Sequence, residues 1–194
     1  MIVTFWQWLQ GSHDFLTSLR QSTFATVSII TPTGFITSDY GKWGPFFVMF
    51  FFLASLIGGC TGSTTGGIKI FRFQVLLALT KSHLLQLRRP HGVYVPIYQD
   101  HKISDSVAFS VFTFITLYCF CLVILALALA GMGVDFMTSL SGAAACISNV
   151  GPGLGELIGP HTSFALLGDG PKLVMMAGMI LGRLELLTIL VLFI

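Results

Sequence analysis

The chain has 194 residues, of which 54% are hydrophobic and only 9% are charged, with a net charge of +2. Soluble domains carry about a quarter charged residues, so this composition excludes an ordinary soluble globular domain and favours an integral membrane protein. The small net charge identifies no binding partner. The placement of the charges along the chain is more informative.

The first elements predicted are a short helix and a loop rich in oxygen atoms. Residues 14–30 are moderately apolar and begin near Asp14, which suits a helix N-terminus. This segment is too short to cross a bilayer, so we predict a re-entrant helix. A polar loop follows over 31–37, with the sequence Thr31-Pro32-Thr33-Gly34-Phe35-Ile36-Thr37.

The next apolar segment, 46–87, is interrupted by five glycines among ten residues, which cannot sustain a regular helix. Irregular backbone at membrane depth is tolerated only where protein buries it or where it lines a watery cavity. A broken transmembrane segment therefore suggests the passage of ions or small solutes. A phosphate-binding loop is not predicted, because Ile68 separates the last glycine from Lys69. The loop reads Gly58-Gly59-Cys60-Thr61-Gly62-Ser63-Thr64-Thr65-Gly66-Gly67.

Positive charge is concentrated between Lys69 and Lys102, a segment that contains six lysines and arginines but only one acidic residue, Asp100. The positive-inside rule places this segment in the cytoplasm. The alternative is a binding patch for anionic lipid or nucleic acid. Membrane lipid headgroups suit such a patch, whereas nucleic acid is not predicted as a partner, because no nucleic-acid-binding motif supports that interpretation.

The second half of the chain repeats the order of the first. An uncharged span is predicted over 107–130, a short helix over 135–147 that begins near Asp135, and a long apolar helix over 173–194. Between the last two lies a loop over 148–155, with the sequence Ser148-Asn149-Val150-Gly151-Pro152-Gly153-Leu154-Gly155.

The order of short helix, glycine loop and long helix thus recurs at a spacing of 117 residues, from Gly34 to Gly151. We expect one unit over 1–90 that lacks a spanning helix in front, a cytoplasmic connection over 91–106, and a complete unit over 107–194. The asymmetry suggests a truncated chain or a first span upstream. Both loops would open to the outer side and line one pore.

The two glycine loops have the composition of a cation filter. A dehydrated alkali cation needs several oxygens, and backbone carbonyls supply them without net charge. Either loop alone would be interpreted as a plain extracellular turn, but their recurrence at matching places favours a filter. We predict K⁺ ligands at Thr33, Gly34, Asn149 and Val150, within a filter made of Thr31, Pro32, Thr33, Gly34, Phe35, Ser148, Asn149, Val150, Gly151 and Pro152.

The last span contains two charges, Arg183 and Glu185. A charge at the bilayer centre costs at least about 2.5 kcal/mol on the insertion scale, so each should face protein or water. One interpretation is that they tie helices together. The other is that Arg183 lies below the filter, where it forms a positive barrier or donates to carbonyls of the 58–67 loop.

Four motifs together resemble the Trk/Ktr/HKT superfamily of potassium uptake proteins, and most of all the bacterial Trk membrane subunit. The resemblance implies an all-α membrane protein with four repeats around one pore, each an outer helix, pore helix, filter loop and inner helix. This chain would be the third repeat without its outer helix, and the whole fourth. The motifs are Thr31-Pro32-Thr33-Gly34-Phe35, Gly58 to Lys69, Asn149-Val150-Gly151-Pro152-Gly153-Leu154-Gly155 and Gly182-Arg183-Leu184-Glu185.

The resemblance further implies that Gly34 and Gly151 are filter glycines, that the 58–67 loop is an intramembrane gate, and that Arg183 latches it. It implies K⁺ as the transported ion, no organic cofactor and no enzyme activity, in the bacterial inner membrane as a multi-pass protein. The implied partners are the missing N-terminal half or sister repeats, a second copy in a homodimer, and a cytoplasmic nucleotide-binding regulatory subunit. Pro32 departs from the threonine usual in the family.

Two other functions stay open at this point. An ion-coupled secondary transporter also uses broken helices, but it predicts inverted repeats, whereas both units here run the same way. A truncated, non-conducting scaffold subunit is the second alternative, because two repeats cannot surround one ion with four loops.

Overall fold

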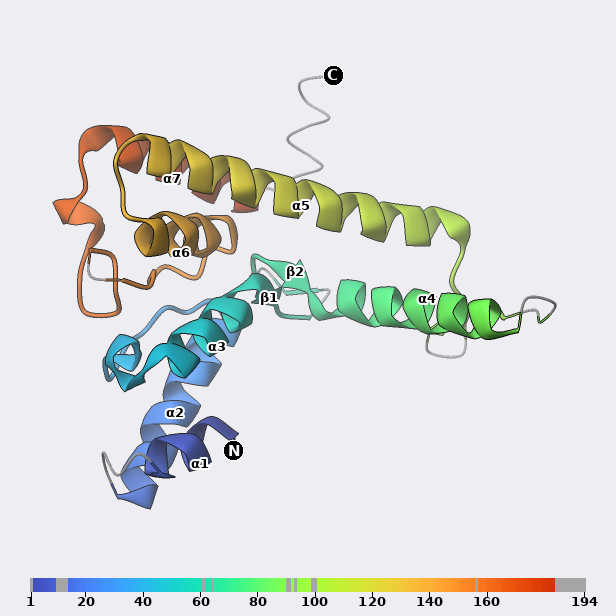
Figure 1. The fold of residues 1–194 in the computed structure, drawn as a ribbon, viewed down its shortest axis with the longest axis horizontal. Coiled ribbons are helices and arrows are strands. Elements are labelled where there is room, and N and C mark those ends of the chain that lie inside the picture. Colours follow the sequence, from blue (N-terminus) through green and yellow to red (C-terminus); the bar gives the residue numbers. More distant parts are fainter. Residues whose placement is uncertain are drawn as a thin grey trace.

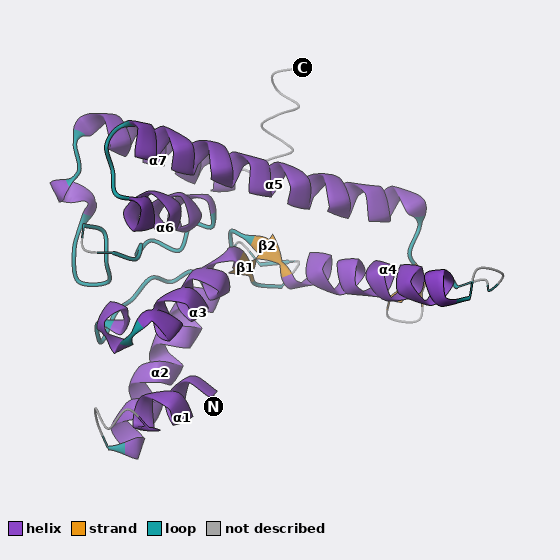
Figure 2. Cartoon of the chain, viewed as in Figure 1, coloured by secondary structure: helices purple, strands orange, loops and turns teal. Residues whose placement is uncertain are grey.

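The structure is a computed structural model that describes residues 2–9, 14–60, 62–63, 65–89, 92, 94–98, 101–155 and 157–183. Over these residues the chain is mainly helical, which confirms the predicted all-α class (Figure 2). The elements of the first half are α1 (Ile2–Leu9), α2 (Phe15–Ile30), the short 3₁₀ helix η1 (Tyr40–Trp43), α3 (Pro45–Leu56) and α4 (Ile70–Arg88).

The second half contains α5 (Asp105–Gly131), α6 (Phe136–Ile147), the 3₁₀ helix η2 (Phe164–Leu166) and α7 (Asp169–Arg183). Two short strand pairs complete the described elements. They are the parallel pair β1 (Ile57–Gly58) and β2 (Ile68–Lys69), and the antiparallel pair β3 (Ile97–Tyr98) and β4 (His101–Lys102).

Among the described helices, α5 alone is long and apolar enough to cross a membrane, while α3 and α6 are shorter apolar helices. The predicted outer helix over 107–130 begins two residues too late, because Asp105 starts α5 and its charge suits a helix N-terminus. The predicted start of the last helix, at 173, is also wrong, since α7 begins at Asp169. Its predicted continuation over 184–194 lies outside the described residues.

The two short helices begin as the sequence predicts, but their aspartates act differently. Asp135 caps α6, since its carboxylate accepts from the backbone N–H of Met137 at 3.1 Å. Asp14 occupies the same position before α2 but makes no side-chain capping bond there.

The main core lies where α5, α6 and α7 pack together (Figure 1). Leu129 of α5, Cys146 and Ile147 of α6, and Met175 of α7 are buried in it. Every residue of α6 from Ser141 to its end is buried, so this helix is held on several sides. Close packing on several sides suits α6 because its many small residues allow the neighbouring helices to approach its backbone.

A second core joins the two halves of the chain. Phe47 and Phe51 of α3 and Ile29 of α2 pack there with Val150 and Leu154 from the loop after α6. This core therefore fixes the second predicted filter loop against the helices of the first unit.

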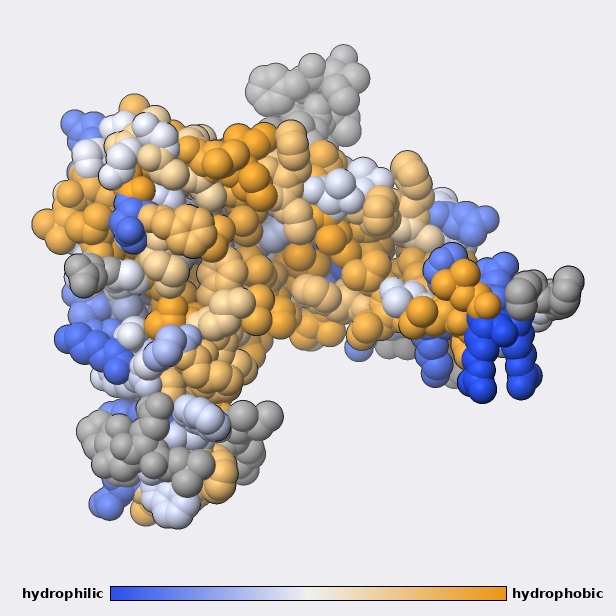
Figure 3. All heavy atoms as spheres, in the orientation of Figure 1, coloured by the Kyte–Doolittle hydropathy of each residue, from blue (hydrophilic) through white to orange (hydrophobic). Residues whose placement is uncertain are grey.

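The outer face of α5 carries exposed apolar side chains such as Phe109, Phe120 and Leu127, and the space-filling view shows mostly apolar surface over the body of the molecule (Figure 3). Hydrophilic atoms gather at the far end of α4, where Lys81, Arg88 and Arg89 are exposed. This distribution suits a protein surrounded by lipid, with a charged end outside the apolar layer.

The connection predicted over 91–106 contains a hairpin that sequence patterns did not indicate. Its β3–β4 pair folds back on α4, where Ser82 Oγ donates to the carbonyl of Tyr94 at 2.9 Å. The Tyr98 hydroxyl donates to Gln74 Oε1, also at 2.9 Å. These bonds fasten the connection to the helix.

Candidate functional site

The first predicted filter loop folds back onto the end of α2. The backbone N–H of Thr31 donates to the Val27 carbonyl at 2.9 Å, and that of Thr33 donates to the Ser28 carbonyl at 3.0 Å. The second bond spans five residues, so it draws the loop inward from the line of the helix. The loop then continues past Gly34 toward η1.

The second predicted loop repeats these bonds at the end of α6. The N–H of Ser148 donates to Ala144 at 2.9 Å, and that of Val150 donates to Ala145 at 3.1 Å. Each donor and acceptor lies 117 positions after its counterpart in the first loop. The internal repeat thus extends to individual backbone hydrogen bonds.

Both loops also share an unusual backbone conformation. Pro32 and Asn149 have φ of 25° and 54°, and Gly34 and Gly151 have φ of 70° and 102°. Positive φ at alternate positions turns successive peptide groups in a way that regular helices and strands do not. The glycines are required here because their φ values are disfavoured for other residues.

The two loops meet each other directly. A methyl group placed on Gly34 would lie 2.5 Å from the carbonyl oxygen of Val150, so the backbones are already in contact. The Val150 side chain is buried in the second core, while Thr33 and Gly151 are exposed. Two oxygen-rich loops, each at the C-terminal end of a short helix, therefore converge on one place.

The glycine-rich loop between α3 and α4 is closed on itself. At its base β1 and β2 pair in parallel, with Ile57 opposite Ile68. Within it the N–H of Gly59 donates to Thr65 Oγ1 at 2.8 Å, and the N–H of Thr65 donates to Ser63 Oγ at 3.3 Å. Hydroxyl groups thus satisfy backbone donors in a segment that has left the helix.

This loop lies against the base of the second predicted filter loop. A methyl group on Gly66 would overlap the Ser148 carbonyl, and one on Gly182 of α7 would overlap the Ile147 carbonyl. The Asn149 side chain is tied to the same helix, because its Nδ2 donates to the carbonyl of Met179 at 3.3 Å. Backbone of the glycine loop and of α7 therefore closely approaches the end of α6.

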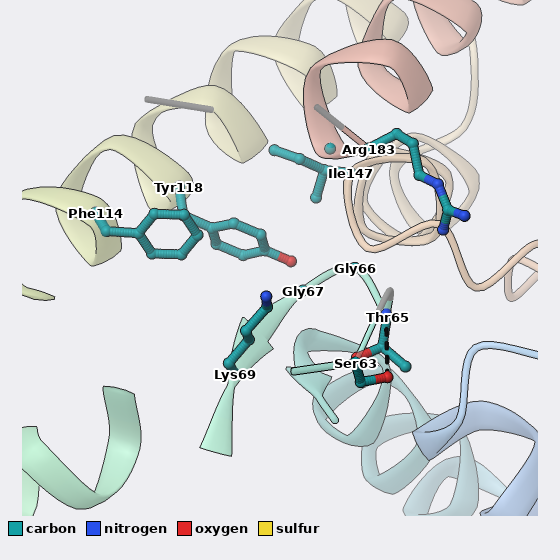
Figure 4. A pocket seen from close by; sticks show the side chains of 10 residues that line it. Ser63, Thr65, Gly66, Gly67, Lys69, Phe114, Tyr118, Ile147 and Arg183 are labelled. Atoms are coloured by element: carbon teal, nitrogen blue, oxygen red, sulfur yellow. Dashed lines mark hydrogen bonds between the residues drawn. The ribbon is translucent and has the colours of Figure 1, made fainter. Parts of the chain in front are cut away.

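A cavity of about 240 Å³ opens beside this contact (Figure 4). The glycine loop lines one side of it, and α5, α6 and α7 line the rest. The Tyr118 hydroxyl reaches from α5 to within 2.7 Å of Ser148 Oγ, and its ring stacks on Phe114. The lining residues are Ser63, Thr65, Gly66, Gly67, Lys69, Phe114, Tyr118, Ile147, Gly182 and Arg183.

Comparisons with known proteins identify the family of the chain. The sequence model of the TrkH family, described as a cation transport protein, matches residues 9–194. This chain belongs to the TrkH family. Its relatives are potassium uptake proteins and not enzymes, so the predicted resemblance to the Trk proteins and the predicted lack of enzyme activity are confirmed.

Two curated relatives of this TrkH-family chain are informative. It is 45% identical to the Trk system potassium uptake protein TrkI of Halomonas elongata, over 99% of the chain and 39% of TrkI. It is 38% identical to TrkG of Escherichia coli, over the whole chain and 39% of TrkG. The chain therefore spans about two fifths of the length of these relatives.

A solved structure of a family member resembles this chain in three dimensions as well. The crystal structure of the potassium transporter TrkH from Vibrio parahaemolyticus superposes with a TM-score of 0.91 at 32% identity. The superposition covers all of this chain and 41% of that one. The membrane fold and the potassium-channel-like helix repeats are thereby established for this TrkH-family chain.

The structure brings most of the predicted site residues of this TrkH-family chain together around the end of α6. Arg183 is exposed and lines the cavity with the glycine loop. Lys69 and Arg72, counted above with the basic segment, are half-buried instead, and Arg72 lies 3.6 Å from the centroid of the Phe114 ring. The predicted gate residues Thr61 and Thr64 lie outside the described residues, as does Glu185.

Two residues of this site were missed from the sequence. Tyr118 is the only tyrosine of the uncharged segment 107–130, and a tyrosine in an apolar span usually needs a partner for its hydroxyl. The sequence therefore indicated that Tyr118 needs a hydrogen-bond partner, but it did not indicate that this partner is Ser148. Ser28 of α2 donates its hydroxyl to the Phe35 carbonyl of the first loop at 2.7 Å, but it belongs to no motif, so nothing in the sequence distinguishes it from the other serines of that helix.

Proposed function

We propose that this chain supplies part of a pore for potassium uptake. In this proposal 31–37 and 148–155 are two segments of the selectivity filter, and 58–67 is an intramembrane gate. The observation that carries it is the convergence of two loops with the same backbone bonds and the same pattern of positive φ, where Gly34 lies against the Val150 carbonyl.

The chemistry follows from the oxygen ligands that K⁺ loses with its water shell. Carbonyl oxygens replace that shell, and the positive φ values help successive carbonyls to point in one direction. The C-terminal ends of α2 and α6 add about half a negative charge each, which favours a cation. We assign the ion ligands to the carbonyls of Thr33, Gly34, Asn149 and Val150.

The gate is proposed from the position of the glycine loop. Gly66 lies against the Ser148 carbonyl at the base of the filter, and the cavity beside it leaves space for the loop to move. Arg183 lines that cavity, where its positive charge opposes a passing cation and can latch the loop. Loss of this side chain should therefore increase flux.

The assembly around this chain is also a proposal. The lengths of TrkI and TrkG are consistent with further repeats that complete the ring of loops around the ion. From the family resemblance we infer a multi-pass protein of the bacterial inner membrane, a homodimer, and a cytoplasmic nucleotide-binding regulatory subunit.

The test uses a bacterium that lacks potassium uptake and grows only at high K⁺. It receives either this chain alone or a TrkI chimera, in which this chain replaces the matching residues of H. elongata TrkI. We expect the chimera to restore growth at low K⁺ and the chain alone to fail. Growth with the chain alone would mean that its copies complete the ring themselves.

Failure of both proteins, each shown to be in the membrane, would overturn the proposal. A flux assay in proteoliposomes separates it from a coupled transporter. A pore carries K⁺ down its own gradient, whereas a coupled carrier requires a gradient of its second ion. A scaffold subunit would carry no ion in either condition.

A further inference from the structure

The first filter loop lacks one backbone hydrogen bond that the second loop makes. The N–H of Asn149 donates to the Cys146 carbonyl at 3.1 Å. The corresponding bond would run from residue 32 to the Ile29 carbonyl. Residue 32 is a proline, which has no N–H, and its φ of 25° is far from the value near −65° that its ring favours. This turn therefore needs another means of support.

Ser28 of α2 provides such support through its side chain. Its hydroxyl donates to the Phe35 carbonyl at 2.7 Å, and Thr33 Oγ1 lies 3.2 Å from both the carbonyl and the hydroxyl oxygen of Ser28. Ser28 is 5% exposed, so water competes little for these bonds. The corresponding residue of the second unit is Ala145, which has no hydroxyl group.

The bond to Phe35 also limits the row of carbonyls available to an ion. A carbonyl that accepts from Ser28 is turned toward α2, while the Phe35 side chain is 73% exposed. The carbonyls of Thr33 and Gly34 come before the Phe35 carbonyl in the chain. The backbone N–H groups of Thr33 and Gly34 donate to the Ser28 carbonyl at 3.0 and 3.4 Å. Ser28 thus holds both ends of the short segment that would contact the ion.

We propose that Ser28 is a positioning residue that determines ion specificity, because its hydroxyl replaces the support that Pro32 cannot give. The inference rests on the proposed function of this loop as a filter. Selection between K⁺ and Na⁺ depends on where the carbonyls are held and how freely they move. Without the hydroxyl, the carbonyls of Thr33 and Gly34 follow the smaller Na⁺ more readily.

The experiment measures K⁺ and Na⁺ flux through the TrkI chimera in proteoliposomes. In Ser28→Ala the preference for K⁺ over Na⁺ should fall at least fivefold, whereas Ser28→Thr, which keeps the hydroxyl, should retain most of it. Ser18→Ala is the matched control, because Ser18 is a fully buried serine of the same helix far from the loop. It should leave the preference unchanged.

A second substitution tests whether the Ser28 hydroxyl replaces the backbone hydrogen bond that Pro32 cannot make. Pro32→Asn restores the N–H and introduces a residue type that tolerates positive φ, as Asn149 does in the other loop. In this background Ser28→Ala should change ion preference by less than twofold. An undiminished effect there, or an unchanged preference in Ser28→Ala alone, would overturn the inference.

Amide hydrogen exchange keeps the inference testable apart from transport. In Ser28→Ala the N–H groups of Thr33 and Gly34 should exchange faster than in the Ser18→Ala control. If the parent chimera carries no K⁺ but exchange accelerates, the filter proposal fails while the positioning by Ser28 stands. If the parent carries K⁺ and the variant matches it in both exchange and ion preference, the positioning by Ser28 is refuted.

Discussion

A single methyl group at Gly66 should separate the glycine loop from the filter. In Gly66→Ala the added carbon would lie 2.7 Å from the carbonyl carbon of Ser148 and closer still to its oxygen. Both partners are backbone atoms, so no flexible side chain can move aside. Overpacking of this kind costs about 1–3 kcal/mol. If the loop is the proposed gate, this contact exists only while the loop rests against the filter, so the cost falls on the closed position.

A closed position weakened by about 1–3 kcal/mol corresponds to a 5- to 150-fold rise in the ratio of open to closed gate. We expect faster K⁺ flux through the TrkI chimera in proteoliposomes. Gly62→Ala is the matched control, since a methyl there would have no described atom within 4 Å. If Gly66→Ala carried no more flux than Gly62→Ala, with equal amounts of both in the membrane, the loop would not be a gate at this contact.

Three further predictions concern other groups near the two loops. Tyr118→Phe leaves the buried Ser148 hydroxyl without this partner and should lower the free energy of unfolding by about 1–3 kcal/mol, measured as a fall in melting temperature. Burial, with a smaller contribution from the Asp39 carboxylate, raises the pKa of Tyr40. The Tyr40 hydroxyl therefore loses its proton in the unfolded chain at a lower pH than in the folded one, and the free energy of unfolding falls as pH rises above about 10. Tyr40→Phe should reduce this loss of stability at alkaline pH, measured in a pH series of melting curves. Arg183→Ala should raise K⁺ flux about fivefold or more, equivalent to about 1 kcal/mol, and equal flux in a folded variant would count against the latch.

Two elements of this fold have a strong local cause in the sequence. The uncharged run of 107–130 allows little besides a spanning helix, and the five glycines of 58–67 cannot continue one. The start of α7 lies at Asp169 and not at the predicted residue 173, because Asp169 and Pro171 suit the first turn of a helix.

The site was predicted less completely, because its remaining parts depend on contacts between distant segments. Gly66 meets Ser148 and Gly182 meets Ile147 only after α6 is enclosed by its neighbours. Composition showed that the loops were rich in oxygen, but it could not show that Ser28 bonds to the Phe35 carbonyl. The β3–β4 hairpin was missed for a similar reason, since its bonds to α4 hold it in place.

The parallel pairing of β1 with β2 has a mechanical consequence. The chain leaves this pair at Gly58 and returns to it at Ile68 in the same direction, so α3 and α4 are linked across the base of the glycine loop. A pull along α4 would therefore act first on the backbone hydrogen bonds of the paired strands, and it would extend the loop only after those bonds broke. While the pair is intact, a displacement of α4 along its axis would move α3 with it and leave the glycine loop closed at its base.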